Sequence, residues 1–159
     1  MLKMLAIRAY FDTSVFGGVF DAEFARPTKR LFTQVDAGVF LPVVSAIVAD
    51  EITEAPQRVR LAYEHCLIAA EVVAIDEAAL ALRDAYMKAG IVAEQWAADA
   101  LHVALATVAG CAMIVSWNFK HIVSFRRIPL YNAVNKANGY GEIGIFTPQE
   151  VIEDEDEDV

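Results

Sequence analysis

The sequence predicts a three-layer α/β domain, in which a central, mainly parallel sheet lies between two layers of helices. Short apolar runs rich in β-branched and aromatic residues alternate with longer segments of helical pattern, and this alternation is typical of βαβ units. The 159 residues, 57% of them hydrophobic, suit one domain with one core. We assign residues 1–150 to this domain and residues 151–159 to an acidic, disordered tail.

The first strand is predicted at Ile7–Phe11, a short apolar run. A helix is expected from Pro27 to about Asp36, because proline suits the first turn of a helix and Gly38 suits the position after its end. A second strand, Val39–Val44, follows, although it contains a proline, which is unusual inside a sheet.

Two helices and a strand complete the first half of the chain. Ser45 is expected to cap a helix that runs to Glu54, and Pro56 separates it from a second helix that continues to Ala70. The apolar run Glu71–Ile75 is predicted as the third strand.

The second half begins with two helices whose ends are marked by glycine. Asp76 is expected to cap a helix that ends at Ala89 before Gly90, and the Ala-rich segment Glu94–Ala109 is predicted as a long helix that ends before Gly110.

The last predicted elements are short. Cys111–Ser116 is the most strand-like run in the chain, Phe119–Val123 and Leu130–Lys136 are predicted as helices, and Ile143–Phe146 as a final strand.

Charge and hydropathy exclude several classes of protein. The formal net charge is −9, but six of the 22 acidic residues fall between Glu153 and Asp158, so the rest of the chain carries 16 acids against 13 basic residues. A terminal run of like charge is typically solvated; mimicry of a polyanion and shielding of a basic groove remain alternatives. Basic residues are not clustered enough to predict strong nonspecific binding to nucleic acid.

The expected location is the cytoplasm. The N-terminal apolar segment is too short for a signal peptide, and no apolar run reaches the roughly 18 residues of a membrane span. Cys66 and Cys111 stand alone in apolar surroundings and show no metal-ligand spacing, so both are expected to be reduced core residues.

Four side chains are candidates for a site at one edge of the sheet. Ligands of open α/β sheets bind beyond the carboxyl ends of the strands, where Asp12 and Asn118 follow two predicted strands. Glu51 falls on the apolar face of its helix, and Asp99 lies among small and apolar residues near the start of the Ala-rich helix. A buried carboxylate needs a cation, a hydrogen-bond donor or water, so a structural salt bridge is the alternative for Glu51.

Oxygen ligands of this kind favour Mg²⁺ or Mn²⁺ over zinc. A divalent ion held by carboxylates activates water for attack on a phosphodiester. The site is therefore predicted to serve phosphoryl transfer.

Four stretches, YFDTSVFGG, VVSAIVADEI, DALHVALA and IVSWNFKHI, resemble in order and spacing the PIN domain, and more closely PIN proteins of the VapC toxin type. The match spans roughly residues 6–122. The resemblance implies a Rossmann-like three-layer fold and a Mg²⁺- or Mn²⁺-dependent ribonuclease. It also implies a homodimer, an RNA substrate and, for a toxin of a type II toxin–antitoxin pair, a small antitoxin partner.

Carried onto this sequence, the resemblance makes Asp12, Glu51 and Asp99 the metal ligands and Ser14 the hydroxyl that orients Asp12. Asn118 stands where many members have another acid. An amide oxygen can bind a metal or orient water but carries no charge, so affinity for a second ion should fall.

Further residues near the site have two interpretations each. Lys120 and His121 are candidates for contacts with substrate phosphate, or belong to a solvated loop. Arg126 and Arg127 either supply a basic rim, together with basic residues near position 60, or are ordinary surface charge.

Other polar and aromatic residues are assigned structural roles. His102 is expected to be a partly buried histidine with its hydrogen bonds satisfied. Trp96 and Trp117 could stack on bases, but Trp96 is expected in the core. Thr13 with Ser14 can also be the cap of a helix, and Gly17 with the glycine that follows is interpreted as loop, because no phosphate-binding motif is present.

The sequence therefore predicts a metal-dependent endoribonuclease acting on RNA. The alternative is a PIN-fold RNA-binding or protein-interaction module with weakened catalysis, which Asn118 favours. A DNA substrate also remains open.

Overall fold

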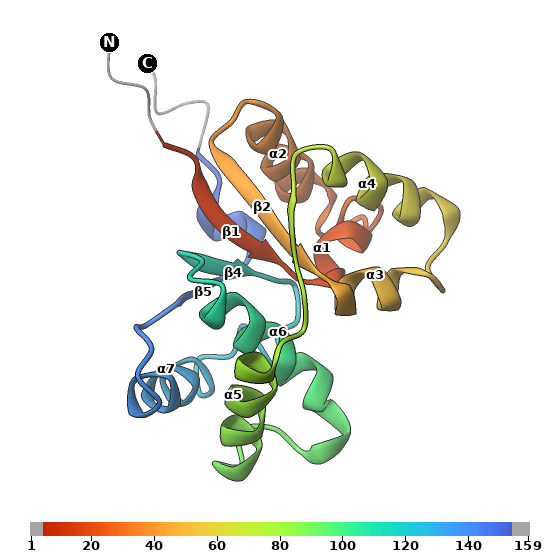
Figure 1. The fold of residues 1–159 in the computed structure, drawn as a ribbon. Helices are drawn as coiled ribbons and strands as arrows, with labels where there is room; N and C mark the ends of the chain where they lie inside the picture. Colours follow the sequence, from red (N-terminus) through yellow and green to blue (C-terminus); the bar gives the residue numbers. More distant parts are fainter. Residues whose placement is uncertain (1–4, 154–159) are drawn as a thin grey trace.

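The structure is a computed structural model that describes residues 5–153. One sheet of five parallel strands forms its centre, in the order β3-β2-β1-β4-β5 (Figure 1). The strands are β1 (Ile7–Phe11), β2 (Phe40–Ser45), β3 (Glu71–Val73), β4 (Met113–Val115) and β5 (Gly144–Phe146). The predicted α/β class and parallel sheet are confirmed.

Helices lie on both sides of the sheet and make the structure three-layered (Figure 1). One group contains α1 (Thr13–Gly18), α2 (Ala25–Asp36), α3 (Ala46–Ile52) and α4 (Gln57–Leu67). The other contains α5 (Glu77–Lys88), the 3₁₀ turn η1 (Glu94–Trp96), α6 (Ala97–Val108) and α7 (Ile128–Ala137). A last short helix, α8 (Pro148–Val151), packs against α2.

Glycines end three helices where the sequence predicts it. Gly38, Gly90 and Gly110 follow α2, α5 and α6 with φ of 82°, 74° and 72°. These values lie in the left-handed region that residues with a Cβ avoid. The predicted cap of α5 is also confirmed, because the Asp76 carboxylate accepts from the N–H of Ala79 at 2.8 Å.

The segment after β1 is a helix, as one interpretation of Thr13 and Ser14 expects, but it also includes the two glycines that the sequence predicts as loop. Asp12 is the N-cap residue of α1, and both glycines lie inside the helix. A Cβ on Gly18 would lie 2.6 Å from Nε1 of Trp117 and 2.8 Å from Oγ1 of Thr28. Glycine therefore permits close packing of α1 against these side chains.

The predicted helix Phe119–Val123 is wrong, because this segment is a series of turns. The side chain of Asn118 accepts from the N–H of His121 at 3.0 Å, and its carbonyl accepts from Ile122 and Val123. The Asn118 carbonyl thus closes a single helical turn, and the bond to its side chain and the bond from Val123 do not continue it as a helix. The predicted third strand is shorter than expected, and Glu94–Ala109 divides into η1 and α6.

The strand order has a topological switch point between β1 and β4, where the direction in which successive strands are added to the sheet reverses. The chain builds outward from β1 to β2 and β3 on one side and from β4 to β5 on the other. Phe11 and Val115 are register partners at the ends of β1 and β4. The residues that follow them meet at the edge where α/β sheets bind ligands.

Two further expectations concern the C-terminal tail and membrane spans. Val151, assigned to the tail, ends α8, and the carbonyl of Glu153 accepts from Arg30 and Gln34. The remainder of the expected disordered tail, 154–159, lies outside the described residues. Within residues 5–153, no helix has the length and apolar character to cross a membrane.

The two cysteines are free and buried, as expected. Burial raises the pKa of Cys66 to about 12 and that of Cys111 to about 11. Both thiols therefore stay protonated and unreactive at neutral pH.

Candidate functional site

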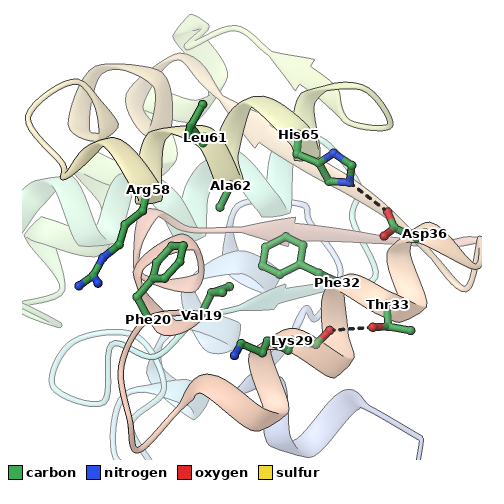
Figure 2. Close-up of a pocket in the computed structure, with 10 residues that line it drawn as sticks. All are labelled: Val19, Phe20, Lys29, Phe32, Thr33, Asp36, Arg58, Leu61, Ala62 and His65. Atoms are coloured by element: carbon green, nitrogen blue, oxygen red, sulfur yellow. Dashed lines mark hydrogen bonds and ion pairs between the residues drawn. The ribbon is translucent and has the colours of Figure 1, made fainter.

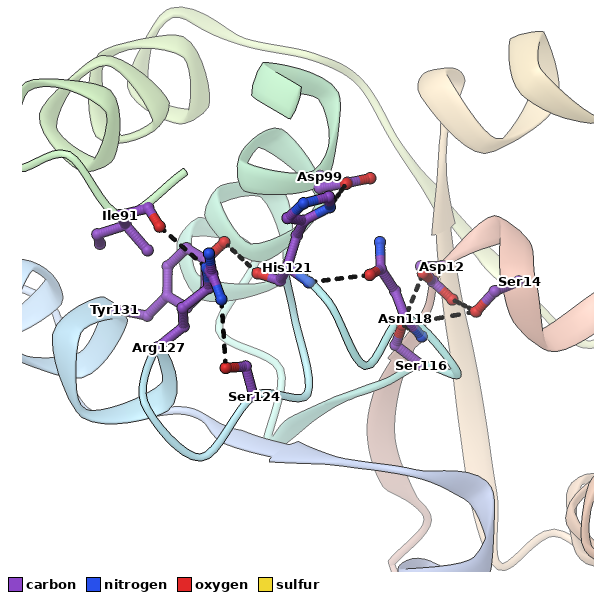
Figure 3. Close-up of polar contacts among 10 residues, drawn as sticks. All are labelled: Asp12, Ser14, Ile91, Asp99, Ser116, Asn118, His121, Ser124, Arg127 and Tyr131. Carbon is purple, nitrogen blue, oxygen red and sulfur yellow. Dashed lines mark hydrogen bonds and ion pairs between the residues drawn. The ribbon is translucent and has the colours of Figure 1, made fainter. Parts of the chain in front are cut away.

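Asp12 lies at the switch point, directly after β1. Its side chain is 4% exposed. The hydroxyl of Ser14 donates to Oδ1 at 2.6 Å and that of Ser116, the residue after β4, donates to Oδ2 at 2.7 Å (Figure 3). The N–H of Trp117 in turn donates to Oγ of Ser14 at 2.8 Å. Two strands and α1 thus fix this carboxylate.

Glu51 is paired with His102, at the end of a buried chain of hydrogen bonds. Oε1 of Glu51 lies 2.6 Å from Nε2 of His102 and accepts from Thr13 at 2.8 Å. Nδ1 of His102 lies 2.7 Å from the hydroxyl of Tyr10, which lies 2.7 Å from Oγ of Ser45. We call the Glu51–His102 contact the His102 pair.

The direction of this chain follows from its ends. A carboxylate only accepts hydrogen bonds, so Nε2 of a neutral His102 carries the proton and Nδ1 accepts from Tyr10. Burial raises the pKa of Tyr10 well above its usual value, which keeps the phenol a donor. Ser45, expected to cap α3, makes no side-chain capping bond and instead serves this chain.

Asp99 forms a second pair, with His121, which we call the His121 pair. Oδ2 of Asp99 lies 2.8 Å from Nδ1 of His121 (Figure 3). Both side chains are mostly buried, at 19% and 13% exposure. The hydroxyl of Tyr131 donates to the His121 carbonyl at 2.7 Å and anchors the turn.

Asn118 links Asp12 to the His121 pair. Its N–H donates to Oγ of Ser116 at 2.9 Å, and its Oδ1 accepts from the N–H of His121 (Figure 3). The amide oxygen that could have bound a metal is therefore used inside the turn.

Burial and hydrogen bonding move the two central acids in opposite directions. Burial raises the pKa of Asp12, and His102 and the two serine hydroxyls only partly oppose it. Partial burial acts in the same sense on Glu51, but the bonds with His102 and Thr13 outweigh it and lower the pKa of Glu51. Keeping Asp12 ionised in this buried position therefore lowers the free energy of unfolding.

The residues fit a hard divalent cation by their chemistry, although they are not gathered around one point. Within residues 5–153, no three His, Cys, Asp or Glu side chains form a metal-binding group. In the same range, hydroxyls alone bond the Asp12 carboxylate, and Oε2 of Glu51 and Oδ1 of Asp99 accept no hydrogen bond. Anionic oxygens with open coordination positions suit Mg²⁺ or Mn²⁺.

The residues predicted to contact substrate phosphate differ in their exposure to solvent. Lys120 and Arg126 are exposed, whereas His121 is held in its pair. Arg127 is partly buried and donates to the carbonyl of Ile91 at 3.0 Å. Lys120 and Arg126 are thus the cations of this set that are open to solvent.

The two tryptophans differ in their exposure from what the sequence predicts. Trp96, expected in the core, is 45% exposed and stacks on the His121 ring at 4.6 Å between centroids. Trp117 is partly buried, stacks on Phe24 at 4.1 Å and donates to Thr28 at 2.9 Å, so its ring is held by protein neighbours.

Sequence reasoning missed three residues of the site. The sequence pattern marks Ser116 only as the end of a strand, Tyr10 only as part of a strand, and His102 only as a histidine with satisfied hydrogen bonds. The hydrogen bonds of His102 are satisfied as expected, but the residue is 2% exposed and contacts Glu51, a candidate metal ligand. The available signal was its place three residues after Asp99 on the same helix.

A separate apolar groove lies between α2 and α4, away from these acids (Figure 2). It has a volume of about 510 Å³, and Ala62 of α4 points across it toward Phe20 and Phe32. The acids at the switch point do not line it. The groove therefore does not belong to the candidate site.

Comparison with known proteins identifies the fold. No protein-family model matches the sequence, and no curated protein matches it either. Among solved structures, the chain is similar to FitAcB from Neisseria gonorrhoeae, with TM-score 0.57 and 15% identity over 90% of this chain and 99% of that one.

It is also similar to VapBC2 from Rickettsia felis, solved bound to a DNA fragment from their promoter. The TM-score is 0.53 at 15% identity, over 77% of this chain and 94% of that one. These similarities, with the five-stranded parallel sheet, confirm the predicted three-layer PIN fold. At this identity they show the fold alone.

Proposed function

We propose that this protein is a Mg²⁺- or Mn²⁺-dependent endoribonuclease that acts as the toxin of a type II toxin–antitoxin pair. The observation that carries the proposal is the Asp12 carboxylate, which is buried at the switch point and, within residues 5–153, is hydrogen-bonded by hydroxyl groups alone. Such a group is costly to the fold unless it binds a cation.

Each acid has a defined role in this proposal. Asp12, Glu51 and Asp99 would hold the ion, which when bound activates water and stabilises charge on a phosphodiester. Ser14 and Ser116 fix the rotamer of Asp12, so the carboxylate is preorganised rather than recruited on binding.

Asn118 limits the number of ions. Its Oδ1 is bonded to the His121 N–H, and an amide adds no negative charge for a second cation. We therefore propose one tightly held ion.

Cleavage of RNA by the purified chain tests the proposal. With Mn²⁺ or Mg²⁺, wild type should cleave a mixed-sequence RNA, and Asp12→Asn and Asp99→Asn should each abolish cleavage. The matched control is Asp50→Asn, because Asp50 neighbours Glu51 on α3 but is exposed. Cleavage that survives both site substitutions refutes the proposal, and preference for a DNA strand of equal sequence would change its substrate.

A second candidate is a PIN-fold module that binds RNA or protein without cleaving. The observation that favours it is the engagement of Glu51 and Asp99 by histidines. Calorimetry separates the two: absence of heat at millimolar Mn²⁺ supports the binding module, and tight binding that Glu51→Gln abolishes supports the nuclease.

The partners form part of the same proposal. From the sequence resemblance to VapC-type toxins we propose a small antitoxin partner and a homodimer, and the similarity of the fold to VapBC2, solved bound to a DNA fragment from its promoter, supports the resemblance. Light scattering should give twice the mass of the 17.4 kDa chain, and the mass of one chain would refute the homodimer.

A further inference from the structure

Trp96 is a large aromatic side chain exposed beside the candidate site. It ends η1, and 45% of its surface is open to solvent. Its ring stacks on that of His121, with an interplanar angle of 26° and a centroid distance of 4.6 Å. One face of the indole is thus covered by the imidazole, and the exposed surface is available to a ligand.

His121, whose ring lies under Trp96, is held by three hydrogen bonds, one to the ring and two to its backbone. Nδ1 of His121 bonds Asp99 at 2.8 Å, its N–H donates to Asn118 at 3.0 Å, and its carbonyl accepts from Tyr131 at 2.7 Å (Figure 3). A ring fixed in this way orients the indole stacked on it. The platform is therefore rigid before any ligand binds, which lowers the entropy lost on binding.

The platform is continuous with the candidate site. His121 joins Trp96 to Asp99, a proposed metal ligand, and to Asn118, which bonds Ser116 beside Asp12. A base stacked on the indole would place its own backbone at the same sheet edge. Lys120, adjacent to His121 and exposed, supplies a positive charge for phosphate there.

We propose that Trp96 is the stacking platform for an unpaired base of a single-stranded RNA substrate. The proposal rests on the proposed function, because it takes RNA as the substrate. A flat, exposed π-surface accepts any base that is free of its own stack, whereas a duplex keeps its bases stacked inside. The platform thus selects single strands without selecting sequence.

Binding of a fluorescein-labelled 12-nucleotide single-stranded RNA in EDTA tests the proposal, because EDTA removes the metal required for cleavage. Stacking of one base on an aromatic side chain predicts that Trp96→Ala weakens binding roughly 5- to 100-fold. Trp96→Phe, which keeps a smaller ring, should recover most of the affinity. Leu61→Ala is the matched control, because Leu61 is an exposed apolar residue on α4, and it should leave the affinity unchanged.

Two further measurements separate stacking from a structural role. Binding of RNA should quench the tryptophan emission of wild type. The Trp96→Phe variant should show no such quenching, because its remaining tryptophan, Trp117, is packed against Phe24. Calorimetric Mn²⁺ affinity should be the same in wild type and Trp96→Ala. A loss of Mn²⁺ affinity would instead show that Trp96 acts by supporting His121, and would overturn the proposal.

Other outcomes also decide whether Trp96 is a stacking platform for RNA. RNA affinity unaffected by Trp96→Ala overturns it, as does a change in oligomeric state alone, which would assign Trp96 to a protein contact. A 12-base-pair RNA duplex that binds as tightly as the single strand also counts against it. Single-strand binding that depends on Trp96 in a chain that never cleaves RNA would leave this proposal standing and refute the nuclease.

Discussion

The His102 pair and the His121 pair have the same chemistry in different surroundings. Each joins a carboxylate of the candidate site to an imidazole, at 2.6 Å and 2.8 Å. His102 is enclosed in the core and continued by Tyr10 and Ser45, whereas His121 lies in a turn under an exposed indole. The difference indicates that His102 serves the fold and the position of Glu51, while His121 supports the side chain of Trp96, which is 45% exposed and open to a ligand.

The largest expected effect separates the two histidines by stability. His102→Ala would leave a cavity and unpair Tyr10 and Glu51, at a cost of about 2–4 kcal/mol in the free energy of unfolding. His121→Ala removes a side chain of a turn, and should cost about 1 kcal/mol. Urea unfolding of both variants measures the difference, and equal losses would contradict the distinction between the pairs.

The tyrosines behind the two histidines give a smaller contrast. Tyr10→Phe would leave the facing polar atoms of both His102 and Ser45 without this partner, whereas Tyr131→Phe would unpair only the carbonyl of His121. Each buried polar group left unpaired costs about 1–3 kcal/mol, so Tyr10→Phe should be the more destabilising. Thermal unfolding of the two variants checks this, and the opposite order would show that the chain behind His102 contributes little.

The fold could be predicted from the sequence better than the pairs could. Strands such as Ile7–Phe11 and the glycine ends of helices are local patterns, and the structure confirms them. The His102 pair joins residues 51 positions apart and the His121 pair residues 22 apart. No local pattern reports such contacts.

The errors have physical causes that can be named. The two glycines of α1 predict a loop because glycine is a poor helix former, and the close packing of Gly18 against Trp117 explains why glycine stands at that helical position. Trp96 was placed in the core because its spacing is helical, although it precedes α6 in a 3₁₀ turn. Tertiary contacts decided both positions.

The smallest expected effects concern the acids themselves, whose pKa values are shifted in opposite directions. Burial raises the pKa of Asp12, so the folded state binds its proton more tightly and wild type loses stability as pH rises above about 4. Asp12→Asn removes this loss and should raise Tm at neutral pH by roughly 2–4 °C, the effect of about 1 kcal/mol.

Glu51→Gln should act with the opposite sign. Because the pKa of Glu51 is lowered in the folded state, its pairing stabilises the protein above about pH 4 and is lost as pH falls through the folded value. The variant should therefore have a lower Tm than wild type at neutral pH, and the gap should close in acid. Calorimetric scans across this range test both acids, and a lower Tm for Asp12→Asn at neutral pH would show that Asp12 is structural.

Calorimetric titration with Mn²⁺ tests the central claim, that the Asp12 edge is a metal site. Wild type and Asp50→Asn should bind one ion with equal affinity, and Asp12→Asn, although folded, should show no binding. Equal binding by Asp12→Asn, or no binding by wild type at millimolar Mn²⁺, would contradict the account.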